Sequence, residues 1–306
     1  MTAVDLREIC IELDTFFNIE AFVEKDWEQF LPESYKGAVQ RFYRPTFAEG
    51  VWNGLMLENP EPEATIDRAY LTVFPTQGII DKIIAKEVER GAKGSLIFTH
   101  HPTAYSEKTA EFTPIKVEQL EELKEHNISL YSCHAPLDCH PEISTANAFA
   151  DALGLEDQQR FGYYVAGYAG IHGTVKSTTF QEIAQKLAEV CELPSLRYDQ
   201  CLNNGSSVHH IAIVPGGGGD PQFIDEARQL SVDTYITGHW WLFGTSEYAR
   251  RNREEFPKYI AGLDINLLGA THYSTELIVM RDQMVGWFRE RSIEAIVIRQ
   301  QDAWGS

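Results

Sequence analysis

The sequence lacks the paired cysteines and the long apolar runs that mark several classes of protein. Its 306 residues include only five cysteines, an odd number that forms no CxxC pair. We therefore expect reduced thiols, as in a reducing compartment. No stretch approaches the roughly 18 to 20 uninterrupted apolar residues of a membrane-spanning helix. The first residues carry acids where a secretory signal has a basic start, so we expect a cytoplasmic protein that does not contact membranes.

Positive charge is also scarce. Lysine and arginine total 26 against 45 aspartates and glutamates, which gives a formal net charge of −19. Proteins that bind nucleic acids need a basic surface, so we expect no nucleic-acid partner. The hydrophobic fraction of 43% and the charged fraction of 23% are typical of a soluble globular protein. The length is sufficient for one large or two ordinary domains.

Four consecutive segments are expected along the chain. Residues 1–60 form an N-terminal helical approach segment, with helical apolar spacing over 5–17 and 19–30. Strands and helices then alternate in two similar series that predict a first α/β lobe and a second α/β lobe. A stretch rich in glycine and tyrosine connects them and contains a helix over 179–191. The first lobe covers residues 61–160, the connecting segment covers 161–207, and the second lobe covers 208–306.

Each lobe shows the order strand–helix–strand–helix–strand, which predicts a three-layer α/β fold with mostly parallel or mixed sheets. In the first lobe the strands are 68–74, 95–99 and 128–133, and the helices are 78–90, 117–126 and 144–153. In the second lobe the strands are 208–214, 234–237, 266–268 and 295–299, with helices at 221–230, around 246–253 and after Tyr273.

Three clusters of histidine and carboxylate fall at predicted strand ends. His100 and His101 follow the apolar run Ser95–Thr99, and ligands of open α/β sheets collect at such strand ends. The second cluster contains His134 and Asp138, and the third contains His272 and Glu276. His272 and Glu276 are four residues apart, so both would project from one face of a helix.

Neutral imidazoles and carboxylates suit zinc, iron, manganese or nickel. His100, His101, Asp138, His272 and Glu276 are too many ligands for one tetrahedral catalytic site, but two metal ions sharing Glu276 would use all five. A separate role, orienting a ligand or shuttling a proton, is expected for His134. The alternatives are a chance histidine pair, a surface pair of His272 with Glu276, and a His134 that bonds a backbone carbonyl.

Three further features carry weaker signals. The loop Pro215–Gly219 lies between a strand and a helix, where its amides could cradle a phosphate or simply form a flexible turn. His209 and His210 begin a strand rather than end one, so we interpret them as structural. Trp240 and Trp241 could line a pocket or form an oligomer contact.

Seven short motifs follow one another along the chain and together form a recognisable pattern. They are Trp52-Asn53-Gly54-Leu55, Thr99-His-His-Pro102, Tyr131-Ser-Cys-His-Ala-Pro-Leu-Asp138, Asn147 with Ala152-Leu-Gly-Leu155, Pro215-Gly-Gly-Gly-Gly219, Tyr235-Ile-Thr-Gly238 and Thr271-His-Tyr-Ser-Thr-Glu276. In these motifs and in their order, the chain resembles the Nif-three-like proteins, the dinuclear-metal family often labelled GTP cyclohydrolase I type 2. By this resemblance His100 and Asp138 hold one metal ion, His101 and His272 hold the other, and Glu276 bridges them.

The resemblance also implies two interlaced, pseudo-repeated α/β lobes with the metal site between them, commonly assembled as a toroidal homohexamer. The chain departs from the family pattern at three places. His239 stands where the family has an acid, Phe243 stands where it has a histidine, and the aspartate common at the end of the first strand is replaced near Phe74.

The leading hypothesis is therefore a cytoplasmic two-metal hydrolase that acts on a small phosphorylated or nucleotide-like substrate, possibly like GTP cyclohydrolase I type 2. A rival hypothesis is a non-catalytic metal-binding or partner-binding protein that serves as scaffold or regulator. A third is an α/β protein that binds a nucleotide at the Gly loop without metal.

Overall fold

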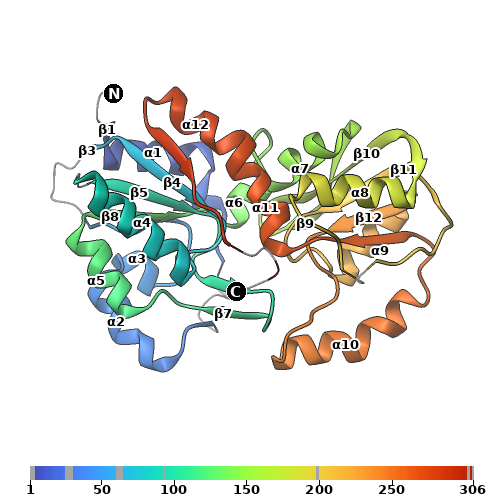
Figure 1. Cartoon of the computed structure of the whole chain (residues 1–306), viewed down its shortest axis with the longest axis horizontal. Coiled ribbons are helices and arrows are strands. Elements are labelled where there is room, and N and C mark those ends of the chain that lie inside the picture. The colour runs from blue at the N-terminus through green and yellow to red at the C-terminus, as the bar shows by residue number, and fades with distance from the viewer. Residues whose placement is uncertain are drawn as a thin grey trace. The chain divides into compact units, whose positions relative to one another are not determined.

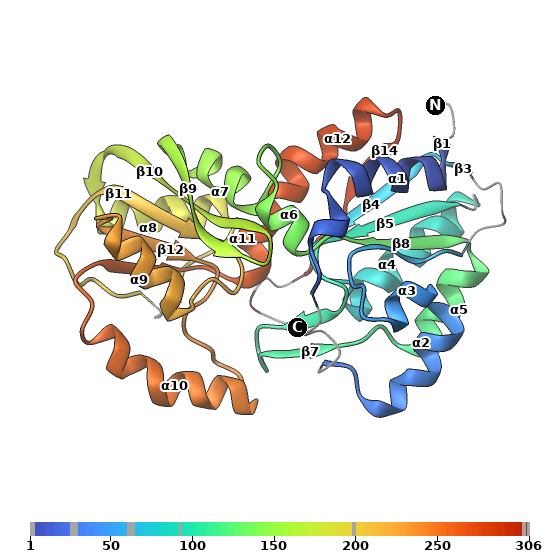
Figure 2. The same cartoon turned by 180° about the vertical axis from the view of Figure 1, so that it is seen from behind.

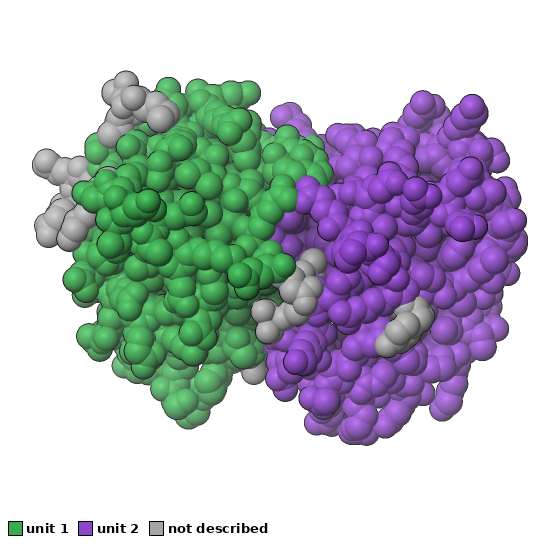
Figure 3. Space-filling model, in the orientation of Figure 1, with its two compact units in different colours: residues 1–105, 112–137, 280–301 green, residues 106–111, 138–279, 302–306 purple. Residues whose placement is uncertain are grey.

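The computed structural model describes residues 4–24, 30–59, 65–91, 94–197, 200–301 and 304. The chain divides into two compact units, each built from separate stretches of sequence (Figure 3). Unit 1 comprises residues 1–105, 112–137 and 280–301, and unit 2 comprises residues 106–111, 138–279 and 302–306. The units differ from the four consecutive segments expected, because the chain returns to unit 1 near its C-terminus.

Unit 1 contains a mixed five-stranded sheet in the order β14-β4-β5-β8-β2. Strands β14, β4, β5 and β8 are parallel, and β2 pairs antiparallel with β8. The C-terminal strand, expected in the second lobe, instead pairs Ala295 with Ala69 of β4. The strands are β2 (Gly54–Leu57), β4 (Arg68–Thr72), β5 (Ser95–Thr99), β8 (Ile128–Ser132) and β14 (Glu294–Val297).

Helices cover both faces of the unit 1 sheet (Figures 1 and 2). Alternate residues of a strand point to opposite faces, and β5 shows this with Ile97 and Phe98. Ile97 joins a core cluster with residues of α2, α4 and α5, whereas Phe98 contacts Phe17, next to α1, and Phe288 of α12. The helices are α1 (Leu6–Phe16), α2 (Lys36–Phe42), α3 (Pro45–Ala48), α4 (Gln77–Arg90), α5 (Val117–Glu125) and α12 (Val285–Glu290).

The helix predicted over residues 19–30 is wrong for the part that the structure describes. A single 3₁₀ turn covers Ile19–Ala21, and residues 22–24 are not helical. Residues 25–29 lie outside the described residues. The side chain of Glu24 instead bonds to Asn53 and His134, which are distant along the chain. These long-range contacts have no local sequence signal.

Unit 2 contains a second mixed five-stranded sheet, in the order β13-β12-β11-β10-β9. Strands β11, β12 and β13 are parallel, whereas β10 is antiparallel to both β11 and β9. The strands are β9 (Glu156–Tyr164), β10 (Gly167–Thr179), β11 (Ser207–Val214), β12 (Thr234–Thr237) and β13 (Asn266–Gly269).

Strand β10 and the end of β9 lie in the segment that was expected to connect the lobes, and β9 begins within the range expected for the first lobe. The glycines of this segment mark close approach between strands. A β-carbon at Gly170 would lie 2.6 Å from Phe161 Cε1 of the neighbouring strand, and one at Gly173 would lie 2.5 Å from the Glu156 carbonyl oxygen. Glycine inside a strand often has this meaning.

Helices also pack against the unit 2 sheet. Residues of α9 and α10 share a core cluster with Tyr235 and Leu267, whereas α7 and α8 contact β10 and β11, and α11 contacts α7 (Figure 1). A π-helical turn at Met280–Met284 follows α11 and leads into α12. The helices are α7 (Thr145–Leu153), α8 (Phe180–Val190), α9 (Pro221–Gln229), α10 (Glu247–Ile260) and α11 (His272–Val279).

Two short pairs complete the described strands: β1 (Val4–Asp5) with β3 (Thr65–Ile66), and β6 (Ala104–Ser106) with β7 (Glu111–Thr113). A 3₁₀ turn lies at Glu33–Tyr35 and a short helix α6 at Ala135–Cys139. The doubled strand–helix order is confirmed, since β4-α4-β5-α5-β8 and β11-α9-β12-α10-β13 repeat it. Among the described helices, none combines the length and the apolar character that crossing a membrane requires.

Candidate metal centre

His100 and His101 directly follow β5, at the carboxyl end of a parallel strand, as predicted. Their backbone N–H groups continue the hydrogen bonding of β5 with the neighbouring strand β4, because His100 donates to the carbonyl of Thr72 and His101 donates to the carbonyl of Val73, just after β4. The hydroxyl of Thr99 donates to the carbonyls of Val73 and His101. Both histidines are buried. The backbone hydrogen bonds therefore hold the two side chains in fixed positions inside unit 1.

The ring of His100 has a defined tautomer. Its Nδ1 lies 2.8 Å from the carbonyl oxygen of Cys133, a group that can only accept a hydrogen bond. Nδ1 therefore carries the proton, and Nε2 keeps the lone pair that a metal needs. The ring of His101 stacks on Phe74, with centroids 4.3 Å apart. Phe74 thus holds a histidine ring in place, at the point where the family pattern has an aspartate.

His134 joins these two residues within unit 1. Its ring centroid lies 5.1 Å from that of His100 and 4.7 Å from that of His101. One nitrogen from each ring lies within 4.8 Å of the others. We call His100, His101 and His134 the histidine set.

Glu24 orients His134 from the N-terminal part of the chain. Its Oε1 lies 2.6 Å from His134 Nδ1, and its Oε2 accepts from Asn53 Nδ2 and the Ala135 N–H. Burial by itself would raise the pKa of Glu24, but His134 and these donors lower that pKa to about 2. Sequence reasoning missed Glu24, because a lone glutamate in a predicted helix carries no signal.

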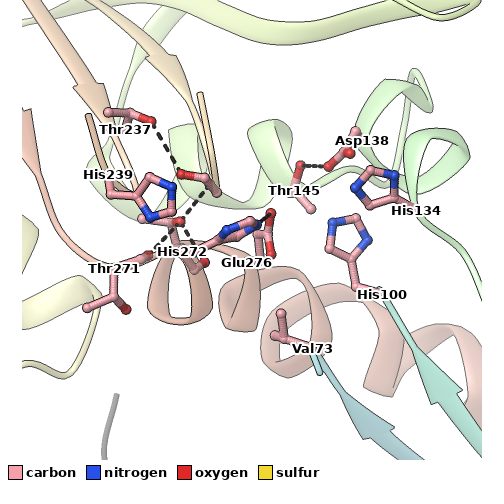
Figure 4. Close-up of polar contacts among 12 residues, drawn as sticks. Val73, His100, His134, Asp138, Thr145, Thr237, His239, Thr271, His272 and Glu276 are labelled. Atoms are coloured by element: carbon pink, nitrogen blue, oxygen red, sulfur yellow. Dashed lines mark hydrogen bonds and ion pairs between the residues drawn. The ribbon is translucent and has the colours of Figure 1, made fainter. Parts of the chain in front are cut away.

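In unit 2, α11 places His272 and Glu276 together, as their spacing predicts. His272 Nε2 lies 3.1 Å from Glu276 Oε1, and both side chains are buried (Figure 4). A carboxylate oxygen of Asp138 lies within 4.8 Å of one from Glu276. We call Asp138, His272 and Glu276 the acidic set. The alternative of a solvent-exposed surface pair does not fit this burial.

Asp138 is held by a neighbour from the next helix. The hydroxyl of Thr145, the first residue of α7, donates to Asp138 Oδ1 over 2.7 Å (Figure 4). A metal-ligating carboxylate is commonly oriented by such a hydrogen bond.

The Gly loop Pro215–Gly219 packs directly on the acidic set. Gly216 has a φ of +60°, and a β-carbon there would overlap with Glu276 Oε1 and lie 2.9 Å from His272 Cδ2. Its N–H donates to Thr275 Oγ1 over 2.9 Å. The loop therefore shapes the surroundings of Glu276, whereas its predicted role as a phosphate cradle stays a prediction.

Glu107 is a second carboxylate that sequence reasoning missed. Its Oε1 accepts from the His272 N–H over 2.5 Å, at the start of α11, and its Oε2 lies 3.3 Å from His239 Nδ1. The rings of His239 and His272 are 5.2 Å apart. An acid thus lies beside position 239 although the residue at that position is a histidine.

The donor chemistry of both sets fits a divalent transition metal. Nitrogen and oxygen ligands of one such ion, each at about 2.0–2.2 Å, lie about 3 Å from one another. The separation of His272 Nε2 and Glu276 Oε1 has this size. The proton on Nδ1 of His100 leaves Nε2 with the lone pair that a metal ligand needs, and the absence of a β-carbon at Gly216 leaves room for the Glu276 carboxylate. Both observations also fit a metal site.

The remaining predicted features are placed as follows. His209 Nδ1 contacts the Val175 carbonyl and His210 Nε2 contacts His172 Nδ1, in keeping with a structural role. Phe243 lies 5.8 Å from the Arg197 guanidinium carbon. Trp240 lines a cavity within unit 2.

Comparison with known proteins identifies the family. Residues 34–302 match the model of the Duf34/NIF3 (NGG1p interacting factor 3) family, and the chain belongs to that family. It is 27% identical over 292 residues to a "GTP cyclohydrolase 1 type 2 homolog" of Pyrococcus horikoshii, covering 94% of each chain. A protein of the same description from Clostridium acetobutylicum is 25% identical over 259 residues, covering 81% of this chain and 87% of that protein.

Solved structures show the same fold. A Bacillus cereus protein related to NIF3 superposes with a TM-score of 0.62 at 13% identity, covering 99% of this chain and 98% of that one. Reduced HcgD from Methanocaldococcus jannaschii gives a TM-score of 0.61 at 19% identity, covering 98% and 100%. At these identities the likeness establishes the NIF3-like fold alone.

Proposed function

We propose that this member of the Duf34/NIF3 family is a dinuclear-metal-dependent hydrolase of a small nucleotide-like or phosphorylated substrate. The observation that carries the proposal is the presence of two sets of side chains of the types that ligate metals, each assembled within its own unit, in which His100, His101, His272 and Glu276 are buried and His134 and Asp138 are partly buried. In the proposal His100 and Asp138 would hold one ion, His101 and His272 would hold the other, and Glu276 would serve both. The names of the relatives support a nucleotide-like substrate.

Two divalent ions, when bound, supply hydroxide at neutral pH and stabilise the charge that develops in a displacement. The chain's own residues do the rest. Thr145 and Cys133 orient Asp138 and His100 toward a metal through the contacts described above. Glu24 holds Nδ1 of His134 and so orients the ring, and in the proposal Nε2 takes a proton from the attacking water and returns it to the leaving group.

Metal analysis tests the ligand assignment sharply, because the two units could also bind metal separately. If the sets act together, His101→Ala and His272→Ala remove the same ion, and the double variant loses no more than either one. If each set binds its own ion, the single variants lose different ions and the double variant loses both. In the proposal His134→Ala keeps both ions.

Turnover is tested with the metal-loaded protein on a panel of nucleotides, including GTP, and of small phosphoesters. Activity should disappear in Glu276→Ala and persist in Glu290→Ala, a control whose side chain is 80% exposed on α12. Zinc, iron, manganese and nickel are compared after chelation. Bound metal without turnover on any substrate would instead favour the rival role of a metal-binding scaffold or regulator.

The proposal also includes a homo-oligomer, expected to be a hexamer, in the cytoplasm. Light scattering coupled to size exclusion measures the mass of the assembly against the 34.7 kDa of one chain. A monomer at micromolar concentration would contradict this part alone.

A further inference from the structure

The hairpin formed by β9 and β10 gathers exposed apolar side chains at its tip. Tyr163 pairs with Tyr168 across the hairpin, and only Val165 and Ala166 separate the two strands. The exposed fractions are 59% for Tyr163, 38% for Val165 and 47% for Tyr168. The other exposed large hydrophobic side chains of the described residues occur singly along the chain. A cluster of this kind is typical of an interaction surface, and we call Tyr163, Val165 and Tyr168 the hairpin tip.

The backbone of Val165 is strained. Its φ is +53°, in the left-handed region, and it is the only β-branched residue with such a φ among the described residues. Two-residue hairpin loops normally place glycine, asparagine or aspartate at such a position, and a β-branched residue there is an outlier. Backbone strain of this kind gathers at functional positions. A glycine would satisfy the turn, so what Val165 adds is an exposed apolar side chain.

The hairpin is held in place before any partner binds. The rings of Tyr163 and Tyr168 contact each other edge to face, with centroids 5.8 Å apart. Arg160 donates to the Tyr168 carbonyl over 3.2 Å, and a β-carbon at Gly167 would lie 2.6 Å from Cys139 Cβ. Because ordered tyrosines lose little conformational entropy on association, this surface is prepared for binding.

Strand β9 lies at the edge of its sheet, but this edge does not suit pairing with a further strand. The N–H of Gly162 already donates to Glu226 of α9 over 3.0 Å, and Phe223 of the same helix packs against Gly162. Gly162 and Asp157 both have positive φ, which interrupts a regular strand edge. A partner would therefore contact the side chains of the hairpin tip rather than extend the sheet.

The sequence around the hairpin tip carries no formal charge. Residues 161–175 include no aspartate, glutamate, lysine or arginine, whereas the whole chain is 23% charged with a net charge of −19. A basic partner would be attracted to acidic surface elsewhere rather than to this stretch. Two copies of the chain repel each other least where neither carries charge. A twofold contact brings the same surface of both copies together, so a neutral aromatic surface can be complementary to itself.

We propose that the hairpin tip binds a second copy of this chain, in a twofold contact between the tips of both copies. The inference names a surface for the homo-oligomer of the proposed function, and it rests on that part of the proposal. Stable interfaces bury about 800 Å² on each partner, so the three side chains form the apolar centre of a larger contact. Tyrosines at the centre of an interface commonly contribute much of the binding energy.

Sedimentation velocity of the full-length protein over a dilution series measures the self-association. Tyr163→Ala and Tyr168→Ala should each raise the dissociation constant at least about tenfold, because both copies lose the side chain. Tyr163→Phe keeps the ring and should retain most of the affinity. Tyr248→Ala, a control that is 68% exposed on α10, should leave the dissociation constant unchanged.

Val165→Gly separates association from folding. Glycine adopts the left-handed φ without strain, so the variant should resist urea at least as well as the parent. Its dissociation constant should nevertheless rise about threefold or more, since an apolar contact is lost. Urea unfolding of samples dilute enough to be monomeric measures the first quantity. A Val165→Gly protein that loses stability but associates like the parent would show that Val165 serves the fold instead.

Two results would overturn the inference in different ways. A parent that stays monomeric at micromolar concentration removes it together with the homo-oligomer. If the parent assembles and all the hairpin variants assemble equally well, the inference alone fails, and another surface joins the copies. Metal content and turnover are measured separately, so an inactive protein that still associates through the hairpin tip would contradict the hydrolase alone.

Discussion

The backbone of Gly216 lies against the carboxylate of Glu276, so that a β-carbon at position 216 would overlap with Glu276 Oε1. The same residue has a left-handed φ of +60°. Glycine is thus required here for two reasons, the conformation of the backbone and the room that Glu276 needs.

Gly216→Ala should therefore displace Glu276 and weaken metal binding at least tenfold, comparable to the loss of an outer-shell contact. The left-handed conformation adds about 1–2 kcal/mol of destabilisation. Gly217→Ala is a matched control, since its β-carbon would meet no atom closer than 3.7 Å. Metal titration of both variants measures the difference. Equal metal affinities would show that the Gly216 contact does not shape the site.

Thr145 should affect the metal through Asp138. Thr145→Val removes the hydroxyl that donates to Asp138 Oδ1 while keeping the shape of the side chain. We expect a 10- to 100-fold loss of metal affinity, the usual effect of removing an outer-shell partner. Thr145→Ser retains the hydroxyl and should restore most of the affinity. A Thr145→Val protein that binds metal as tightly as the parent would exclude Asp138 as an oriented ligand.

Glu24 should matter for stability as well as for His134. Glu24→Ala leaves His134, Asn53 and the Ala135 N–H without their acceptor, and we expect a loss of about 3 kcal/mol in the free energy of unfolding. Glu20→Ala, at an exposed position nearby, should change it by less than about 0.5 kcal/mol. Urea unfolding at pH 7 measures both, and similar small changes would contradict the prediction.

The same carboxylate predicts an acid dependence. Its pKa falls from the ordinary 4.5 to about 2 on folding, so its contribution is complete above pH 4.5 and is lost as the pH falls toward 2. The parent should therefore lose stability over this range more steeply than Glu24→Ala. Parallel slopes for the two proteins would refute the assignment.

His172 predicts a second pH effect at higher pH. Burial lowers its pKa below the ordinary 6.5, and the nearby His210, 3.0 Å away, lowers it further. The folded state thus favours neutral His172, so its contribution to stability is greatest above pH 6.5 and is lost as the pH falls from 6.5 toward the lowered pKa of the folded state. Between pH 8 and pH 5, His172→Gln should lose less unfolding free energy than the parent. His126→Gln, just after α5, is the control and should follow the parent.

The strand ends were predictable because their signals are local. The apolar run Ser95–Thr99, the glycine after Leu153 and the spacing of His272 and Glu276 each act over a few residues. The family was recognisable from motifs of the same kind, and the matching of residues 34–302 confirms it. Glu24 and Glu107 were not predictable, since their partners lie 110 and 165 residues away along the chain.

By itself the sequence determined the alternation of strands and helices, the residues placed at the strand ends, and thereby the chemistry available there. Periodicity and helix caps are properties of neighbouring residues, so they need no knowledge of the fold. Only the tertiary structure decided that β9 and β10 join the second sheet and that β14 joins the first. Pairing between distant strands depends on which edges and faces meet in space, and that information is not contained in any one segment.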